Sequence, residues 1–155
     1  MYISKTATLS SCQQYRYSLE RIWETSDHLL LVVGLNPSTA DADEDDPTIR
    51  RCVGFAKRLG FSGLLVANLF AARSTSPLGL KNFADPIGAD NDLWLTRLQS
   101  RAARIVVAWG NGGSLGSRSG EVLKLLRDPY CFGKTQSGHP RHPLYLRGTS
   151  PIERY

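Results

Sequence analysis

The chain has 155 residues, of which 41% are hydrophobic and 21% are charged, and its formal net charge is +5 at pH 7. This length fits one domain with a single core, and the composition excludes disordered and fibrous proteins. No apolar run approaches the roughly 18 residues of a membrane span, and the N-terminus lacks the apolar core of a signal peptide. We therefore expect one domain over residues 1–155, a monomer without membrane contact, placed in the cytoplasm. The positive charge permits an anionic partner such as nucleic acid without requiring one.

Five segments have the pattern of β-strands. Residues 15–23 alternate in polarity and are rich in aromatic side chains, which indicates an edge strand. Residues 28–33, 64–67 and 105–109 are continuously apolar, as expected of strands that are covered on both faces. A short further strand is expected near residues 131–134.

Three stretches between and after these strands have a helical pattern. Residues 47–59 carry an apolar face, with Asp46 placed to cap the start of the helix and Gly60 to end it. Residues 90–103 and 120–127 also have apolar side chains at helical spacing. Because strands alternate with helices, we expect a three-layer α/β/α sandwich with a mainly parallel four-stranded central sheet and an N-terminal edge strand.

An asparagine follows each of the three continuously apolar strands: Asn36, Asn68 and Asn111. In sheets of this kind, ligands bind beyond the carboxyl ends of the strands. Since one amide both donates and accepts hydrogen bonds, these side chains predict a pocket for a polar, neutral, planar group. The alternative is that asparagine is common in turns because it tolerates unusual dihedral angles, and Asn111, which lies between glycines, fits this alternative best.

Five carboxylates follow the first of these asparagines: Asp41, Asp43, Glu44, Asp45 and Asp46. One interpretation is a solvated loop that leads into a capped helix. The other is that one of these acids, together with Asn36, polarises a water molecule or binds a cation. If the acids lie beside the pocket, a nucleotide or free nucleoside becomes a better ligand than duplex DNA, because the acids would repel a polyanion.

Two of the three histidines, His139 and His142, lie in a late segment, and each is followed by proline. Because proline restricts the residue before it, each imidazole is held on a stiff, non-helical loop that could point it into a site. The alternative is a structural proline-rich turn with exposed histidines. No carboxylate or cysteine is spaced to complete a metal shell, and the three cysteines form neither a disulfide nor a zinc pattern. We therefore expect no metal and no cofactor.

These segments resemble the uracil-DNA glycosylase superfamily, whose fold is a parallel four-stranded sheet between helices. The stretch Gly34-Leu35-Asn36-Pro37 matches a first-loop motif G-x-[N/D]-P, and His139-Pro140-Arg141-His142-Pro143-Leu144 resembles a late H-P-x-P-L loop with one extra residue. Asn68 looks like the asparagine that reads the base, and Trp109-Gly110 ends a run similar to the strand before the superfamily's late helix. Over residues 12–146 the chain more closely resembles an uncharacterised bacterial and phage domain family of unknown function.

The resemblance implies a DNA glycosylase-like hydrolase of DNA repair that cleaves the N-glycosidic bond of a uracil-related or modified pyrimidine base. It implies that Asn36 holds the attacking water and that Asn68 pairs with the edge of an extruded base. Either His139 or His142 would donate a hydrogen bond to the departing base. The further predicted substrate contacts are Gly34, Leu35, Pro37, Ser38, Phe70, Arg73 and Arg141. Among them, Phe70 could stack on the base, as could Phe55, and the alternative is that both belong to the core. The two arginines, like Arg147, could contact phosphates, and the alternative is that they are solvated surface charges.

Two other functions stay open. A module of the same fold could bind a base or nucleotide without cleaving it, and the amide of Asn36 favours this reading because the most active branches of the superfamily carry an aspartate there. A hydrolase of a small nucleotide metabolite would fit the acidic loop. The expected partner is accordingly DNA or a nucleotide.

Overall fold

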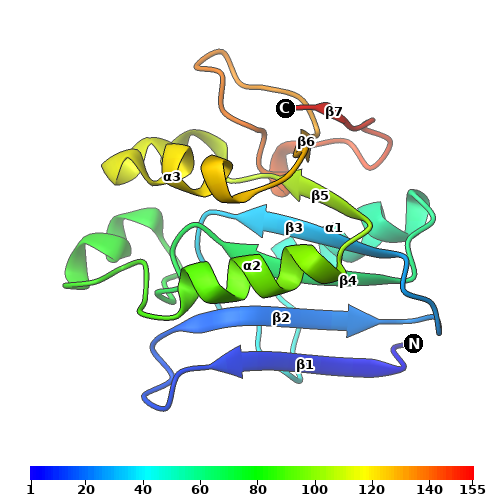
Figure 1. The fold of residues 1–155 in the computed structure, drawn as a ribbon, viewed down its shortest axis with the longest axis horizontal. Coiled ribbons are helices and arrows are strands. Elements are labelled where there is room, and N and C mark those ends of the chain that lie inside the picture. The colour runs from blue at the N-terminus through cyan, green and yellow to red at the C-terminus, as the bar shows by residue number, and fades with distance from the viewer.

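All 155 residues are described by the structure, a computed structural model (Figure 1). The strands are β1 (Ser4–Leu9), β2 (Arg16–Ile22), β3 (Leu29–Gly34), β4 (Gly63–Asn68), β5 (Arg104–Val107), β6 (Tyr130–Cys131) and β7 (Glu153–Arg154). The α-helices are α1 (Pro47–Arg58), α2 (Asn91–Arg101) and α3 (Arg118–Leu125). Three 3₁₀ segments are η1 (Pro77–Asn82), η2 (Gly110–Ser117) and η3 (Pro143–Tyr145).

The strands form one mixed sheet in the order β1-β2-β4-β3-β5-β6-β7. The pairs β4–β3, β3–β5 and β5–β6 are parallel, whereas β1–β2, β2–β4 and β6–β7 are antiparallel. The sheet therefore has seven strands, and the expectation of a four-stranded sheet was wrong. The strand predicted at residues 15–23 exists as β2 but does not lie at the edge, because β1 pairs along its free side.

The missed strands have physical reasons for giving no signal. β1 has the sequence SKTATL, is mostly exposed or half-buried, and carries only one large apolar side chain. β7 has only two residues, which is too short for any periodicity to be visible. The short strand expected near residues 131–134 is present as β6, which lies slightly earlier in the chain, at Tyr130–Cys131.

Side chains alternate between the two faces of the central strands, so each face carries its own core. On one face, Leu31 of β3 packs with Leu95 of α2 and Val122 of α3. On the other, Val32 packs with Phe55 of α1. Figure 1 accordingly shows α2 and α3 in front of the sheet and α1 behind it. None of the helices combines the length and the apolarity that crossing a membrane requires.

Helix α1 begins and ends where its capping residues predict. The Oδ1 atom of Asp46 accepts a hydrogen bond of 2.9 Å from the backbone N–H of Ile49, and Pro47 occupies the first turn. Gly60 follows the helix with φ of 83°, a left-handed conformation that glycine adopts without strain. The predictions of helices at residues 90–103 and 120–127 are also confirmed, with α3 starting two residues before the predicted range.

The acidic segment that follows β3 is held against β2. Asp45 forms an ion pair of 2.7 Å with Arg21, whose side chain is fully buried, and it accepts a further hydrogen bond from Tyr2. Asp41 accepts hydrogen bonds from the backbone N–H groups of Asp43 and Glu44 within its own loop. The segment is thus a folded loop with assigned partners rather than a free run of charge.

Replacement of Asp45 by alanine is expected to lower the free energy of unfolding by about 3 kcal/mol, because it leaves the buried guanidinium of Arg21 without its counter-charge. The matched control is Asp43→Ala, which removes an exposed carboxylate from the same loop and should change stability by less than about 0.5 kcal/mol. Urea denaturation of both variants measures the difference. Equal stability of the Asp45→Ala and Asp43→Ala variants would contradict the role of Asp45 as the counter-charge of Arg21.

Candidate functional site

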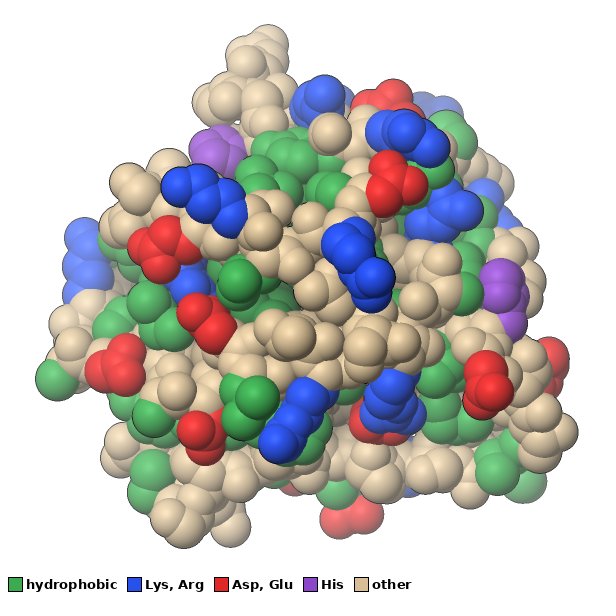
Figure 2. All heavy atoms as spheres, in the orientation of Figure 1, with side chains coloured by type: hydrophobic (Ala, Val, Ile, Leu, Met, Phe, Trp, Pro, Cys, Tyr) green, Lys and Arg blue, Asp and Glu red, His purple; other side chains and the backbone are tan.

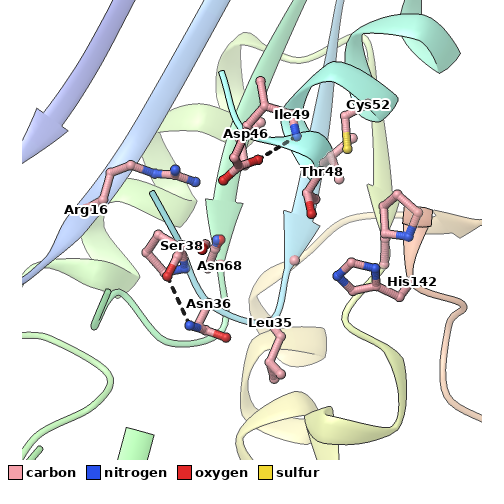
Figure 3. A pocket seen from close by; sticks show the side chains of 16 residues that line it. Arg16, Leu35, Asn36, Ser38, Asp46, Thr48, Ile49, Cys52, Asn68 and His142 are labelled. Carbon is pink, nitrogen blue, oxygen red and sulfur yellow. Dashed lines mark hydrogen bonds between the residues drawn. The ribbon is translucent and has the colours of Figure 1, made fainter. Parts of the chain in front are cut away.

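A pocket lies at the carboxyl ends of β3 and β4, on the face of the sheet that packs against α1 (Figure 3). We call it the inner pocket. Its polar lining comes from Arg16, Asn36, Ser38, Asp46, Thr48, Asn68 and His142. The cavity measures about 50 Å³, and a single water molecule needs roughly 10–15 Å³. A larger hollow of about 450 Å³, the outer pocket, shares Asn36, Asp46 and His142 with it.

The inner pocket brings together residues from distant parts of the sequence. The whole predicted first loop lines it, from Gly34 to Ser38, and so does Asn68. Gly34 and Asn68 are direct partners in the parallel pairing of β3 with β4, which explains why the two strand ends meet. His142 enters from the late loop, which lies against α1 through a hydrogen bond from Arg51 to the carbonyl of Pro143.

The amide of Asn36 is oriented by its nitrogen. Nδ2 donates hydrogen bonds to the carbonyl oxygens of Pro37, at 3.0 Å, and Ser74, at 2.9 Å. The bond to Ser74 joins the loop after β3 to the loop after β4, and the two bonds together fix the plane of the amide. The Oδ1 atom is left to accept a hydrogen bond from a water molecule or a ligand (Figure 3).

The amide of Asn68 is buried and has an unused acceptor. The residue is 4% exposed, and its Oδ1 atom has no hydrogen-bond partner. Gly34 leaves space beside it, since a Cβ atom there would lie 3.7 Å from Oδ1. An unpaired buried acceptor costs about 1–3 kcal/mol, so in a cavity wall it requires a donor from a water molecule or a ligand. Oδ1 of Asn91 and Nε1 of Trp109 are also buried without a partner, but neither atom lies in a residue that lines the inner pocket.

The backbone next to Asn68 is clamped from the other face of the sheet. Asn91, at the start of α2, donates from Nδ2 to the carbonyl oxygens of Asn68 and Leu69. Arg118 of α3 donates from Nε to the same carbonyl of Leu69. The end of β4 is therefore fixed before any ligand arrives.

Replacement of Asn68 by leucine, which has a similar shape, is expected to raise the free energy of unfolding by about 1 kcal/mol while abolishing ligand binding, because it removes an unsatisfied buried acceptor. Asn91→Leu is the matched control. The Oδ1 atom of Asn91 is also unpaired, but its Nδ2 atom donates two hydrogen bonds that hold the end of β4. Loss of these two bonds should lower stability by about 1–3 kcal/mol. Urea unfolding curves decide between these outcomes. A clear loss of stability in Asn68→Leu would show that the amide has a structural role.

His142 presents a hydrogen-bond donor to the pocket. Its Nδ1 atom accepts a hydrogen bond of 3.2 Å from the backbone N–H of Leu144, so the proton of the neutral imidazole lies on Nε2. Burial lowers the pKa of His142 below its ordinary value of 6.5, and the nearby carboxylate of Asp46 opposes part of this shift. The imidazole is therefore neutral at pH 7, with Nε2–H available to a ligand.

His139 and Arg141 are not part of the inner pocket. His139 lies in a turn where its backbone N–H donates to Thr135 Oγ1, and its side chain lines neither pocket. Arg141 is exposed and lines a shallow hollow that also touches His142. Of the two His-Pro pairs, the structure thus brings only the second into the inner pocket.

Two further predicted residues lie outside the pocket. Phe70 is 3% exposed and belongs to the core on the face that packs against α2, so it does not reach a ligand in the inner pocket. Arg73 lies at the rim, beside Ser38 and Thr39, and donates to the carbonyl of Gln13. Its position is compatible with contact to a ligand that extends out of the pocket.

Four pocket residues with polar or ionisable side chains were not predicted as site residues: Arg16, Asp46, Thr48 and Cys52. Asp46 was predicted as a helix cap and as one of five acids that could act with Asn36 on a water molecule or a cation, whereas Arg16 was recognised only as part of an alternating strand. Burial raises the pKa of Cys52 to about 12, so its thiol stays protonated and is no nucleophile. No group of three or more His, Cys, Asp or Glu side chains lies close enough to hold a metal ion.

Comparison with known proteins gives one match. A family model described as "Protein of unknown function (DUF1643)" matches residues 16–144, a range that begins at β2 and ends just after the second His-Pro pair. No curated protein and no solved structure matches the chain. This match confirms the resemblance to an uncharacterised family, whereas no comparison supports the likeness to uracil-DNA glycosylases.

Proposed function

The chain belongs to the DUF1643 family, a family of unknown function, and we propose that it is a DNA glycosylase-like hydrolase of DNA repair. It cleaves the N-glycosidic bond of a uracil-related or modified pyrimidine base in DNA. The observation that carries the proposal is the convergence of Asn36, Asn68 and His142 on one pocket at the carboxyl ends of parallel strands.

The proposal includes a fold of the uracil-DNA glycosylase type. The four central strands β4-β3-β5-β6 are mutually parallel, and both faces of β3 pack against helices. This part of the molecule is compatible with a three-layer α/β/α sandwich, to which β1, β2 and β7 are additions.

Hydrolysis of an N-glycosidic bond develops positive charge on the sugar and negative charge on the departing base. Asn36 accepts a hydrogen bond from the water that adds to the sugar, through its free Oδ1 atom. Asn68 pairs with the base edge, since adjacent N–H and C=O groups of a pyrimidine imide complement the two ends of an amide. His142 donates from Nε2 to a base oxygen as negative charge grows there.

The placement of the acidic segment supports DNA as substrate over a small metabolite. Of its five acids only Asp46 lines the inner or the outer pocket, and its two oxygens accept hydrogen bonds from the backbone N–H groups of Ile49 and Ala40. On the face shown in Figure 2, basic and acidic side chains are interspersed without a continuous basic patch. That face carries α2 and α3, whereas the pocket lies on the side of α1. Contacts with DNA are expected at the rim of the pocket, where Arg73 and Arg141 lie.

A non-catalytic module that binds a base is the second candidate. It is favoured by the identity of residue 36, because an amide is a weaker base than a carboxylate and activates water less. Such a module would use Asn68 and His142 in the same way.

Base release from oligonucleotides tests the proposal. The protein is incubated with single- and double-stranded oligonucleotides that carry uracil, hydroxymethyluracil or a mismatch, and abasic sites are detected by cleavage in alkali. Release of a base supports the hydrolase, and binding without release supports the module. Neither release nor affinity for any of these substrates would refute both.

A further inference from the structure

Arg16 is a buried cation in the wall of the inner pocket with most of its donors unused. The residue is 4% exposed, and its one side-chain hydrogen bond goes from Nη1 to the carbonyl of Ala40, at 3.0 Å. No carboxylate lies within ion-pair distance of it. Burial lowers the pKa of Arg16 to about 10, so the guanidinium is still charged at neutral pH. The negative charge of Asp46 opposes part of this pKa shift, but the two side chains form no ion pair. A buried charge without an ion-pair partner is costly, which makes this arrangement unusual for a purely structural arginine.

An irregularity in β2 aims Arg16 into the pocket. Further along the strand, Leu19 packs in the core beside α1, and Glu20 pairs with Arg101 of α2 on the other face. Strict alternation would turn Arg16 to the side of Glu20. A register shift in the pairing with β1 places Leu9 opposite Arg16 and leaves one extra residue in β2, which returns Arg16 to the side of α1. Bulges of this kind often re-aim a side chain next to a functional site.

The polar groups around Arg16 differ in whether their hydrogen-bonding atoms already have partners. Asp46 already accepts two backbone hydrogen bonds, at 2.9 Å from Ile49 and 3.3 Å from Ala40. Asn68, in the same cavity, has an unpaired Oδ1 atom. Figure 3 shows the guanidinium of Arg16 directed toward Asp46 and Asn68. A ligand that satisfies this wall presents an acceptor to Arg16 and a donor to Asn68.

We propose that Arg16 makes the inner pocket selective for a ligand that carries a negatively charged oxygen group next to its planar heterocycle. The planar fork of an arginine matches a carboxylate or a phosphate and binds either more strongly than a neutral oxygen. The oxyanion is a substituent of the base ring or the phosphate of a nucleotide, and both share this chemistry. The inference rests on the proposed base-binding site and deepens it by naming the charge of the substrate.

Calorimetry on the wild-type protein tests the preference with pairs of ligands that differ in charge. Uracil-5-carboxylate and uracil-6-carboxylate are compared with the corresponding carboxamides, and deoxyuridine monophosphate is compared with deoxyuridine. We expect the charged member of at least one pair to bind about tenfold more tightly or better. Preference in the ring pairs identifies a base substituent, whereas preference in the nucleotide pair, with competition by inorganic phosphate, identifies the phosphate. Equal affinity within every pair, or no binding of any probe, overturns the proposal.

Variants of Arg16 test whether the charge or the shape of this side chain causes the preference for an oxyanion, and a variant of Arg101 is the control. Arg16→Met should abolish the preference, Arg16→Lys should retain part of it, and Arg101→Met, on α2, should retain it fully. If Arg16→Met does not fold, the Arg16→Lys variant and the comparison of charged with neutral ligands on the wild-type protein still test the proposal. A folded Arg16→Met protein that keeps the preference overturns the proposal. Oxyanion preference without any base release would refute the hydrolase alone, and release of neutral uracil without oxyanion preference would refute this inference alone.

Discussion

Replacement of His142 by alanine is expected to lower the rate of base release by about 10²–10³-fold, the usual effect of losing one oriented donor to a developing oxyanion. Its Nδ1 atom is engaged by the backbone N–H of Leu144, so only Nε2–H faces the pocket. The matched control is His139→Ala, from the same proline-rich loop, which should keep the wild-type rate because its imidazole lines neither pocket. Single-turnover kinetics on a uracil-containing oligonucleotide measures both variants.

The pH dependence of His142 gives a second readout. Since burial lowers its pKa below 6.5, base release that needs the neutral imidazole should be constant at neutral pH and fall only as the pH drops through this lowered value. The unfolded chain takes up the proton first, at about pH 6.5. Stability should therefore be complete above that pH and decrease as the pH falls toward the lowered pKa of the folded state. His142→Ala should lack this decrease. Equal losses of activity in His142→Ala and His139→Ala would contradict the role of His142 as the donor to the departing base.

The central strands and the first helix could be predicted because their signals are local. Three continuously apolar runs marked the buried parallel strands, and Asp46 with Gly60 marked the two ends of α1. β1 gave no signal, because it carries only one large apolar side chain and joins β2 through backbone hydrogen bonds that do not depend on side-chain identity. Because β1 was missed, β2 was wrongly predicted to lie at the edge of the sheet.

The site could be predicted where topology alone brings residues together. Asn36 and Asn68 follow neighbouring parallel strands, so the rule on carboxyl ends was enough to place them at one edge. The choice between the two histidines depended on contacts that no motif encodes. Gly110, after β5, donates its N–H to the carbonyl of Pro140, and α1 contacts the loop at Pro143. These contacts turn the second His-Pro pair inward.

Two other residues show what the sequence pattern could not convey. Phe70 comes two positions after Asn68, yet it packs in the core on the opposite face, because the chain leaves the regular strand after β4. Arg16 was read as one polar position in an alternating strand. A bulge reverses that alternation, and bulges have no reliable signature in a single sequence.

The structure also separates two consequences of having an amide at position 36. An aspartate there would be a stronger base toward water, but it could not donate to the carbonyl oxygens of Pro37 and Ser74, as Nδ2 of Asn36 does. In this chain the amide therefore joins two loops that the pocket needs. An aspartate would instead face two carbonyl oxygens with a negative charge and push the loops apart.

Asn36→Ala is accordingly expected to lower base release by about 10²-fold or more, because the attacking water loses the acceptor that orients it. Affinity for the uracil-containing oligonucleotide should fall by a smaller factor, since Asn68 and His142 still hold the base although the loops lose the two hydrogen bonds from Nδ2. Asn36→Asp should also fall below the wild-type rate, despite its stronger base, because it loses both donated hydrogen bonds. Asn82→Ala, an exposed asparagine in η1, serves as the control. Rates of base release and affinities are measured on the same oligonucleotide. Parallel loss of rate and affinity in Asn36→Ala would mean that Asn36 holds the substrate. A higher rate in Asn36→Asp would mean that the hydrogen bond to Ser74 is dispensable.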